Sequence, residues 1–220
     1  TEGGPATMFA RENGRYISVG GGRLIAKNYD SMWTNSEKAR IDVNMITDAD
    51  GNVTDAGNNP VEIEGHATTM TTWYGTGGII NIGLTTGDSK FTGEFAGAGT
   101  QNMWLRNGAV WNNTGIVYNP WSGSNYISDI SSHVTWLHGG NDKSSAGNII
   151  QNSASDLYID NLDGCTKLFM EHDLNYVVPE FAKNPDGSDK VDKDGNKIKN
   201  EDAGQKKIFG KLGNVIIAKA

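Results

Sequence analysis

Three short apolar segments lie almost end to end in NIIQNSASDLYIDNLDGCTKLFMEHD, residues 148–173, and only turn-forming residues separate them. Three strands in about 25 residues is the size of one coil of a parallel β-helix, in which coils stack along an axis. This stretch therefore predicts an all-β chain of stacked, three-strand coils. Its apolar residues come in pairs, which are Ile149 and Ile150, Leu157 and Ile159, and Leu168 and Met170.

The same spacing recurs earlier in the chain, in residues 90–110. The large apolar residues that carry this spacing are Phe91, Phe95, Met103, Leu105 and Val110. One coil cannot bury its own inner face, but coils stacked about 4.8 Å apart give each strand two backbone partners and one continuous apolar column. Asparagine side chains at equivalent positions of successive coils are expected to hydrogen-bond along a ladder.

The composition favours many short strands joined by tight turns. The chain has 29 glycines in 220 residues, well above the usual share of roughly 7%. With 36% hydrophobic and 20% charged residues it suits one folded domain, residues 1–220. A β-sandwich or jelly roll is the rival fold, but it needs longer strands and regular hairpins. The shortness of the apolar segments favours the parallel β-helix.

Two segments depart from the strand pattern and are predicted to protrude. Residues 47–60 turn at Asp50-Gly51, and the charged segment 181–210 alternates like a hairpin across Asp194-Gly195. Asp-Gly is a strong signal for a tight hairpin turn, because glycine accepts a positive φ.

Charge and hydropathy exclude several classes of protein. The net charge is −7 and no basic stripe is present, so nucleic acid is not an expected partner. No apolar run reaches the roughly 18 residues of a membrane span, and no signal peptide is visible. The chain is expected to be a monomeric segment of a longer protein, with Cys165 as a free, partly buried thiol beside a turn.

Motifs for catalysis or metal binding are not apparent. No G-x-S-x-G motif occurs, and Gly87-Asp88-Ser89 is predicted to be a turn between strands. The four histidines have no metal-binding spacing, and alternation along HVTWLH places His133 and His138 on opposite faces. We therefore expect no cofactor, no metal and no enzymatic activity.

One pair of carboxylates leaves an alternative open. If Leu157 and Ile159 face inward, Asp156, Tyr158 and Asp160 share the outer face of the segment. Two carboxylates on such a face could serve as acid and base of a glycosidase or lyase. Solvated surface residues have the same pattern, and we favour that interpretation.

The segments 90–115 and 131–173 resemble the repeated coils of bacterial autotransporter passenger domains. The pieces that carry the resemblance are LRNGAVWNNTG, HVTWLHGG and GNIIQN…DLYIDNLDG…LFMEHD. The resemblance implies a right-handed parallel β-helix, pertactin-like in architecture, that is exported through the outer membrane. It also implies a location on the bacterial surface or outside the cell, and a role in cell adhesion and virulence.

Two segments are the predicted contacts of such an adhesin. The loop 117–127 is rich in Gly, Ser and Asn and carries aromatic residues that could stack on a sugar or anchor a protein, although tryptophans more often fill a core. The charged segment 181–210 is the second. The predicted binding residues are Tyr118, Trp121, Asn125, Tyr126, Lys193 and Asp194. The expected partner is a host-cell surface protein, matrix protein or glycan; a purely structural stalk is a further alternative.

Overall fold

The computed structural model divides the chain into two compact units, Thr1–Met170 with Leu212–Ala220, and Glu171–Lys211. The described residues are 6–11, 14–69, 77–114, 116–119, 124–127, 132–153, 156–170, 180–182, 184, 188–200 and 213–220. They form strands and turns and contain no helix, so the predicted all-β class is confirmed. Within these ranges no helix is long and apolar enough to span a membrane.

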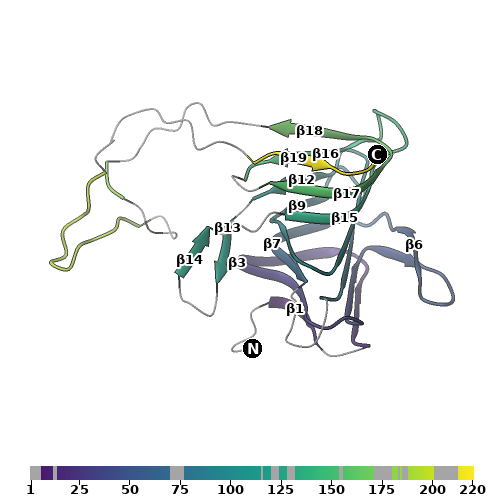
Figure 1. The fold of residues 1–220 in the computed structure, drawn as a ribbon, viewed down its shortest axis with the longest axis horizontal. Coiled ribbons are helices and arrows are strands. Elements are labelled where there is room, and N and C mark those ends of the chain that lie inside the picture. Colours follow the sequence, from purple (N-terminus) through teal and green to yellow (C-terminus); the bar gives the residue numbers. More distant parts are fainter. Residues whose placement is uncertain are drawn as a thin grey trace. The chain divides into compact units, whose positions relative to one another are not determined.

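The first unit is built on two long sheets in which every strand pair is parallel. The eight-stranded sheet contains β1 (Ala6–Ala10), β3 (Gly22–Thr34), β7 (Val61–Thr69), β9 (Lys90–Thr92), β12 (Val110–Asn113), β16 (Gly147–Gln151) and β18 (Thr166–Met170) in this order, with β10 (Phe95–Gly97) also paired to β7. The seven-stranded sheet contains β2 (Tyr16–Val19), β4 (Arg40–Val43), β8 (Ile79–Leu84), β11 (Thr100–Leu105), β15 (Ser132–His138), β17 (Leu157–Asp163) and β19 (Val215–Ile217). Figure 1 shows the strands of the first sheet above one another, from β1 to β18.

The chain alternates between the two sheets, and each return adds the next strand alongside the previous one. Short strands suffice for this arrangement, because an inner strand has backbone partners on both sides. A β-sandwich would require antiparallel sheets, whereas the strand pairs in both of these sheets are parallel.

The prediction that residues 148–173 form one three-strand coil is wrong in detail. β16 and β18 are neighbours in one sheet, with Ile149 opposite Leu168, whereas β17 lies in the other sheet. The stretch therefore covers more than one passage through the two sheets. Strand spacing in a sequence locates the strands, but it does not state which of them pair.

The core consists of apolar columns that cross successive strands in register. In the seven-stranded sheet, equivalent inward positions hold Val43, Ile82, Met103 and Leu137, all buried. Such columns let each strand contribute only two or three apolar side chains and still form a continuous interior.

Aromatic residues fill the other side of this core. Phe91 and Trp111 lie opposite each other in register and stack with ring centroids 6.3 Å apart. Both are fully buried. The indole N–H of Trp111 donates to the carbonyl of Gly93 at 3.0 Å, so its polar atom is satisfied inside the apolar column.

Two antiparallel hairpins interrupt the parallel sheets of the first unit. β5 (Met45–Thr47) and β6 (Val53–Ala56) form the predicted excursion, and it turns at Gly51 with φ +81°, as predicted. β13 (Ile116–Asn119) pairs with β14 (Ser124–Ile127). In Figure 1 the two hairpins project on opposite sides of the stacked strands.

The second unit repeats the turn chemistry of the first hairpin. Asp192-Lys193-Asp194-Gly195-Asn196 matches Asp48-Ala49-Asp50-Gly51-Asn52, with antiparallel bridges around it and Gly195 at φ +84°. In both turns the first aspartate accepts the backbone N–H groups two and four residues later. The reversal expected at Asp194-Gly195 is therefore present. That the whole chain is one domain, from which 181–210 protrudes, stays a prediction.

Candidate functional site

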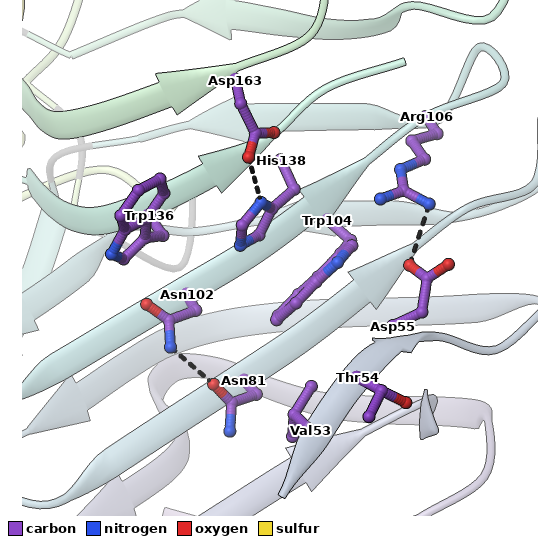
Figure 2. A pocket seen from close by; sticks show the side chains of 10 residues that line it. All are labelled: Val53, Thr54, Asp55, Asn81, Asn102, Trp104, Arg106, Trp136, His138 and Asp163. Atoms are coloured by element: carbon purple, nitrogen blue, oxygen red, sulfur yellow. Dashed lines mark hydrogen bonds and ion pairs between the residues drawn. The ribbon is translucent and has the colours of Figure 1, made fainter. Parts of the chain in front are cut away.

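A groove of about 650 Å³ lies on the outer face of the seven-stranded sheet, beside the β5–β6 hairpin. It is lined by Val53, Thr54, Asp55, Asn81, Asn102, Trp104, Arg106, Trp136, His138 and Asp163. Figure 2 shows the three hairpin residues on one side and Trp136, His138 and Asp163 on the other, with Trp104 between them.

The floor of the groove is a ladder of amide side chains. Asn81 lies opposite Asn102 on the neighbouring strand, and the Asn102 Nδ2 donates to Asn81 Oδ1 at 2.8 Å. Asn81 Nδ2 in turn donates to Asp42 Oδ1 at 2.7 Å. The asparagine ladder expected from the sequence is thus confirmed here. Each amide donates along the stack, which fixes the plane of its side chain.

An ion pair between a partly exposed arginine and a buried aspartate ends this ladder and fixes its direction. Asp42 is fully buried, and Arg40 bonds both of its carboxylate oxygens. The Tyr16 hydroxyl donates to the same carboxylate at 3.0 Å, and the Arg40 guanidinium lies 5.1 Å from the Tyr16 ring centre. A buried carboxylate is tolerated only with such compensation, so Asp42 can serve as a fixed acceptor for Asn81.

Three ring systems form the raised wall of the groove. His138 stacks on Trp104 with ring centroids 4.4 Å apart, and Trp136 stacks on His138 with centroids 5.6 Å apart and ring planes 7° from parallel. Trp104 is 8% exposed, whereas Trp136 is 40% exposed. Trp136 therefore offers an open aromatic surface that packs against the His138 ring.

Two hydrogen-bonded pairs of side chains flank the rings. Asp163 Oδ2 lies 2.8 Å from His138 Nδ1, and Arg106 Nη1 lies 2.9 Å from Asp55 Oδ1 (Figure 2). An ionised carboxylate only accepts hydrogen bonds, so Nδ1 carries the proton, and in the neutral form of the ring Nε2 is an acceptor. Arg106 also donates from Nε to the carbonyl of Gly139 at 3.1 Å, and it thereby links the sheet to the hairpin.

The hairpin wall is held against the sheet by Asn44. This buried residue has φ 56°, and its Nδ2 donates to the carbonyls of Gly57 and Gly83 at 3.0 Å each. Gly83 lies under the hairpin, where an added Cβ would be 2.8 Å from the Cβ of Ala56. A side chain at position 83 would therefore push the hairpin outward and change the groove.

The two histidines of β15 lie on the same outer face, so the prediction of opposite faces is wrong. Val134 and Leu137 are both fully buried, and the two residues between them, Thr135 and Trp136, are not. Strict alternation of inward and outward side chains therefore fails between Val134 and Leu137. As a result His133 also points outward, where its Nε2 lies 2.9 Å from Asp160 Oδ2.

The carboxylates considered for catalysis have structural partners away from the groove. Asp156 Oδ1 accepts the backbone N–H of Asn214 at 2.7 Å and its side-chain amide at 3.0 Å. Asp160 pairs with His133, and neither aspartate lines the groove. The Gly87-Asp88-Ser89 segment forms the predicted turn, with Ser89 buried and its hydroxyl accepting the N–H of Val61.

The predicted binding residues lie elsewhere. Tyr118 and Asn125 are backbone partners in the β13–β14 hairpin, as are Val117 and Tyr126; their side chains and the whole of Trp121 lie outside the described residues. Lys193 and Asp194 are exposed at the turn of the second unit. None of these six predicted residues is among those that line the groove.

A second polar cluster lies inside the first unit. Glu94 is fully buried, and neither carboxylate oxygen has a hydrogen-bond partner among the described residues. Burial, with Asp30 nearby, raises the pKa of Glu94 to about 8. Burial also raises the pKa of Asp30 to about 6, partly offset by a hydrogen bond from Thr68. No group of three or more histidine, cysteine or acidic residues in the described part of the chain is placed to hold a metal ion.

Sequence reasoning did not predict the groove, because it assumed that tryptophans generally fill the core. Trp111 fills the core, whereas Trp104 and Trp136 occupy outer positions next to buried Met103 and Leu137. The signal was present in NMWLRN and HVTWLH, where a tryptophan adjoins an inward apolar residue. Comparisons with protein-family models, curated proteins and solved structures find no match for this chain.

Proposed function

We propose that the chain is a glycan-binding segment of a bacterial surface adhesin, built on a right-handed parallel β-helix and without enzymatic activity. The observation that carries this proposal is the groove beside Trp136, in which an exposed aromatic surface meets amides and carboxylates held in fixed positions. The expected partner is a glycan of a host cell or matrix.

The alternation of the chain between two parallel sheets supports the β-helical architecture. Ile79 lies opposite Thr100, and Phe91 lies opposite Trp111, so one passage without an insertion takes about 20 residues, in the range of solenoid repeats. Crossovers between parallel strands of one sheet are right-handed in about 98% of cases, which favours the right-handed form.

The chemistry of the groove supports a saccharide as its ligand. Sugar rings present C–H groups on their faces and hydroxyls around their edges, and they therefore need a flat apolar surface beside fixed hydrogen-bonding groups. Trp136 supplies the surface, and Asp163 and Asp55 supply acceptors at its side. The stacked strands beneath them form a rigid support, which suits recognition because little order has to be gained on binding.

The binding of purified protein to an array of immobilised glycans tests the proposal. Trp136→Ala is expected to reduce the signal for bound glycans at least tenfold, because the open stacking surface is lost. Tyr158→Ala is the matched control: Tyr158 is also an aromatic residue of this sheet, 38% exposed, but does not line the groove. Equal binding by both variants, or no glycan bound by the unmodified chain, would refute the proposal.

A carbohydrate-active enzyme is the second candidate function, and the His138–Asp163 pair favours it. With Nδ1 directed to Asp163, the Nε2 of His138 could act as a base in a lyase or hydrolase. Incubation of a bound polysaccharide with the protein distinguishes the two functions. Release of shorter products that His138→Gln abolishes would replace the adhesin proposal by an enzyme, whereas intact polymer supports a binding protein.

A further inference from the structure

We infer that the groove selects neutral glycans over anionic ones, a specificity that rests on the proposed function of the same groove. The first argument is its charge. Asp55 and Asp163 both line it, with 49% and 56% of their side chains accessible. Arg106 is the one permanently charged cation among the lining residues.

The guanidinium of Arg106 is already engaged by the protein. Its Nη1 bonds Asp55, and its Nε donates to the carbonyl of Gly139. A carboxylate or sulfate on a glycan would have to compete with Asp55 for this cation. It would also approach Asp163, which forms no ion pair with a lysine or arginine among the described residues. An anionic sugar therefore meets net repulsion in the groove.

The second argument is the excess of free acceptors. One oxygen of Asp163 is bonded to His138, and one oxygen of Asp55 is bonded to Arg106 and to the N–H of Ala56. Among the described residues nothing else bonds the second oxygen of either carboxylate. In the neutral form of His138, Nε2 adds another acceptor. Acceptors require donors from the ligand, and the hydroxyls of a neutral sugar supply them, whereas a carboxylate or sulfate supplies only further acceptors.

The stacking surface fits the same class of ligand. Trp136 stacks against His138 with their planes within 7° of parallel, and it is 40% exposed, so its indole is the open stacking surface. A neutral pyranose can place its C–H face on this indole while its hydroxyls reach the carboxylates. Selectivity thus comes from the charged edge of the groove, and affinity comes from the rings.

Calorimetric titration of the whole chain with oligosaccharides of matched length tests this inference. The neutral set contains the hexamers of β-1,4-glucose, β-1,4-N-acetylglucosamine, β-1,4-mannose and β-1,3-glucose; the anionic set contains hexagalacturonate and hexamannuronate. We expect at least one neutral hexamer to bind, and both anionic hexamers to bind at least tenfold more weakly. Asp163→Asn, which keeps the shape and removes the charge, is expected to reduce this preference at least threefold.

The outcomes separate the inference from the function on which it rests. Tighter binding of an anionic hexamer, or a preference that Asp163→Asn leaves unchanged, overturns the neutral specificity while glycan binding stands. Binding of neutral hexamers that Trp136→Ala leaves intact shows that the groove is not the site, and it overturns both. Failure of every hexamer to bind also removes the proposed function together with the inference.

Discussion

At the scale of single residues, two buried carboxyl groups differ in the number of hydrogen-bond partners that compensate for their burial. Asp42 is buried but bonded by Arg40, Tyr16 and Asn81. Glu94 is equally buried and has no partner among the described residues. A carboxyl group in such a site favours its neutral form, because burial penalises the charge.

Glu94 therefore predicts stability that falls as the pH rises. Its pKa is raised from 4.5 to about 8, so between these values the folded state holds a proton that the unfolded state releases. The contribution is fully present below about pH 4.5 and is lost by about pH 8. Asp30 acts in the same direction between 3.8 and about 6.

Denaturant unfolding at pH 5, 7 and 9 measures this effect. We expect Glu94→Gln to lose less stability than the unmodified chain between pH 5 and pH 9, by on the order of a few kcal/mol. Glu62→Gln is the control: Lys90 and Arg23 lower the pKa of Glu62, so it stays ionised throughout this window. Parallel pH profiles for Glu94→Gln and the unmodified chain would contradict the prediction.

At the scale of elements, the groove depends on one hairpin docked on one sheet. Asn44 makes this contact through hydrogen bonds to the carbonyls of Gly57, Asn59 and Gly83. The absence of a side chain at Gly83 lets the hairpin approach. The hairpin turn is encoded locally, but its position over the sheet is not.

Replacing Asn44 is predicted to loosen the hairpin. Asn44→Gly keeps a residue suited to φ 56° but leaves three carbonyls without this donor, and we expect a loss of about 1–3 kcal/mol in unfolding free energy. Asn44→Ala should cost more, since alanine resists this φ. Denaturant unfolding measures both variants, and equal stability of Asn44→Gly and the unmodified chain would argue against the role of the side chain.

At the scale of the whole first unit, the terminal strands β18 and β19 of the two sheets carry exposed apolar side chains. Leu168 and Met170 on β18 continue positions that are buried on β16, yet they are 45% and 47% exposed. Ile217 on β19 likewise follows buried Ile159 and is 44% exposed. Among the described residues, β18 and β19 therefore each pair with a neighbouring strand on one side only.

The rate of amide hydrogen exchange is therefore predicted to be lowest in the inner strands of each sheet and highest in the terminal strands. In an array stabilised by contacts between neighbours, the ends fray first. We expect the amides of β8, β11 and β12 to exchange slowest and those of β1, β2, β18 and β19 to exchange fastest, with measurement by mass spectrometry. Uniform protection across all strands would instead indicate one all-or-none unit.

The sequence by itself determined the all-β class, most strand positions, the reversals at Asp50-Gly51 and Asp194-Gly195, and the asparagine ladder. These features follow from local chemistry: alternation, residue size and the freedom of glycine at positive φ. Only the tertiary structure decided that Trp136, Asp163 and Asp55 meet in one groove.

The physical reason is that pairing between distant strands leaves no local trace in the sequence. Trp136 lies opposite Asn102 and Asn161 through backbone register. Val134 and Leu137 are both buried, and this break in the alternation along β15 leaves both His133 and His138 on the outer face. Strand spacing could not reveal either feature, because both are set by which strands are neighbours and by the shape of the core beneath them.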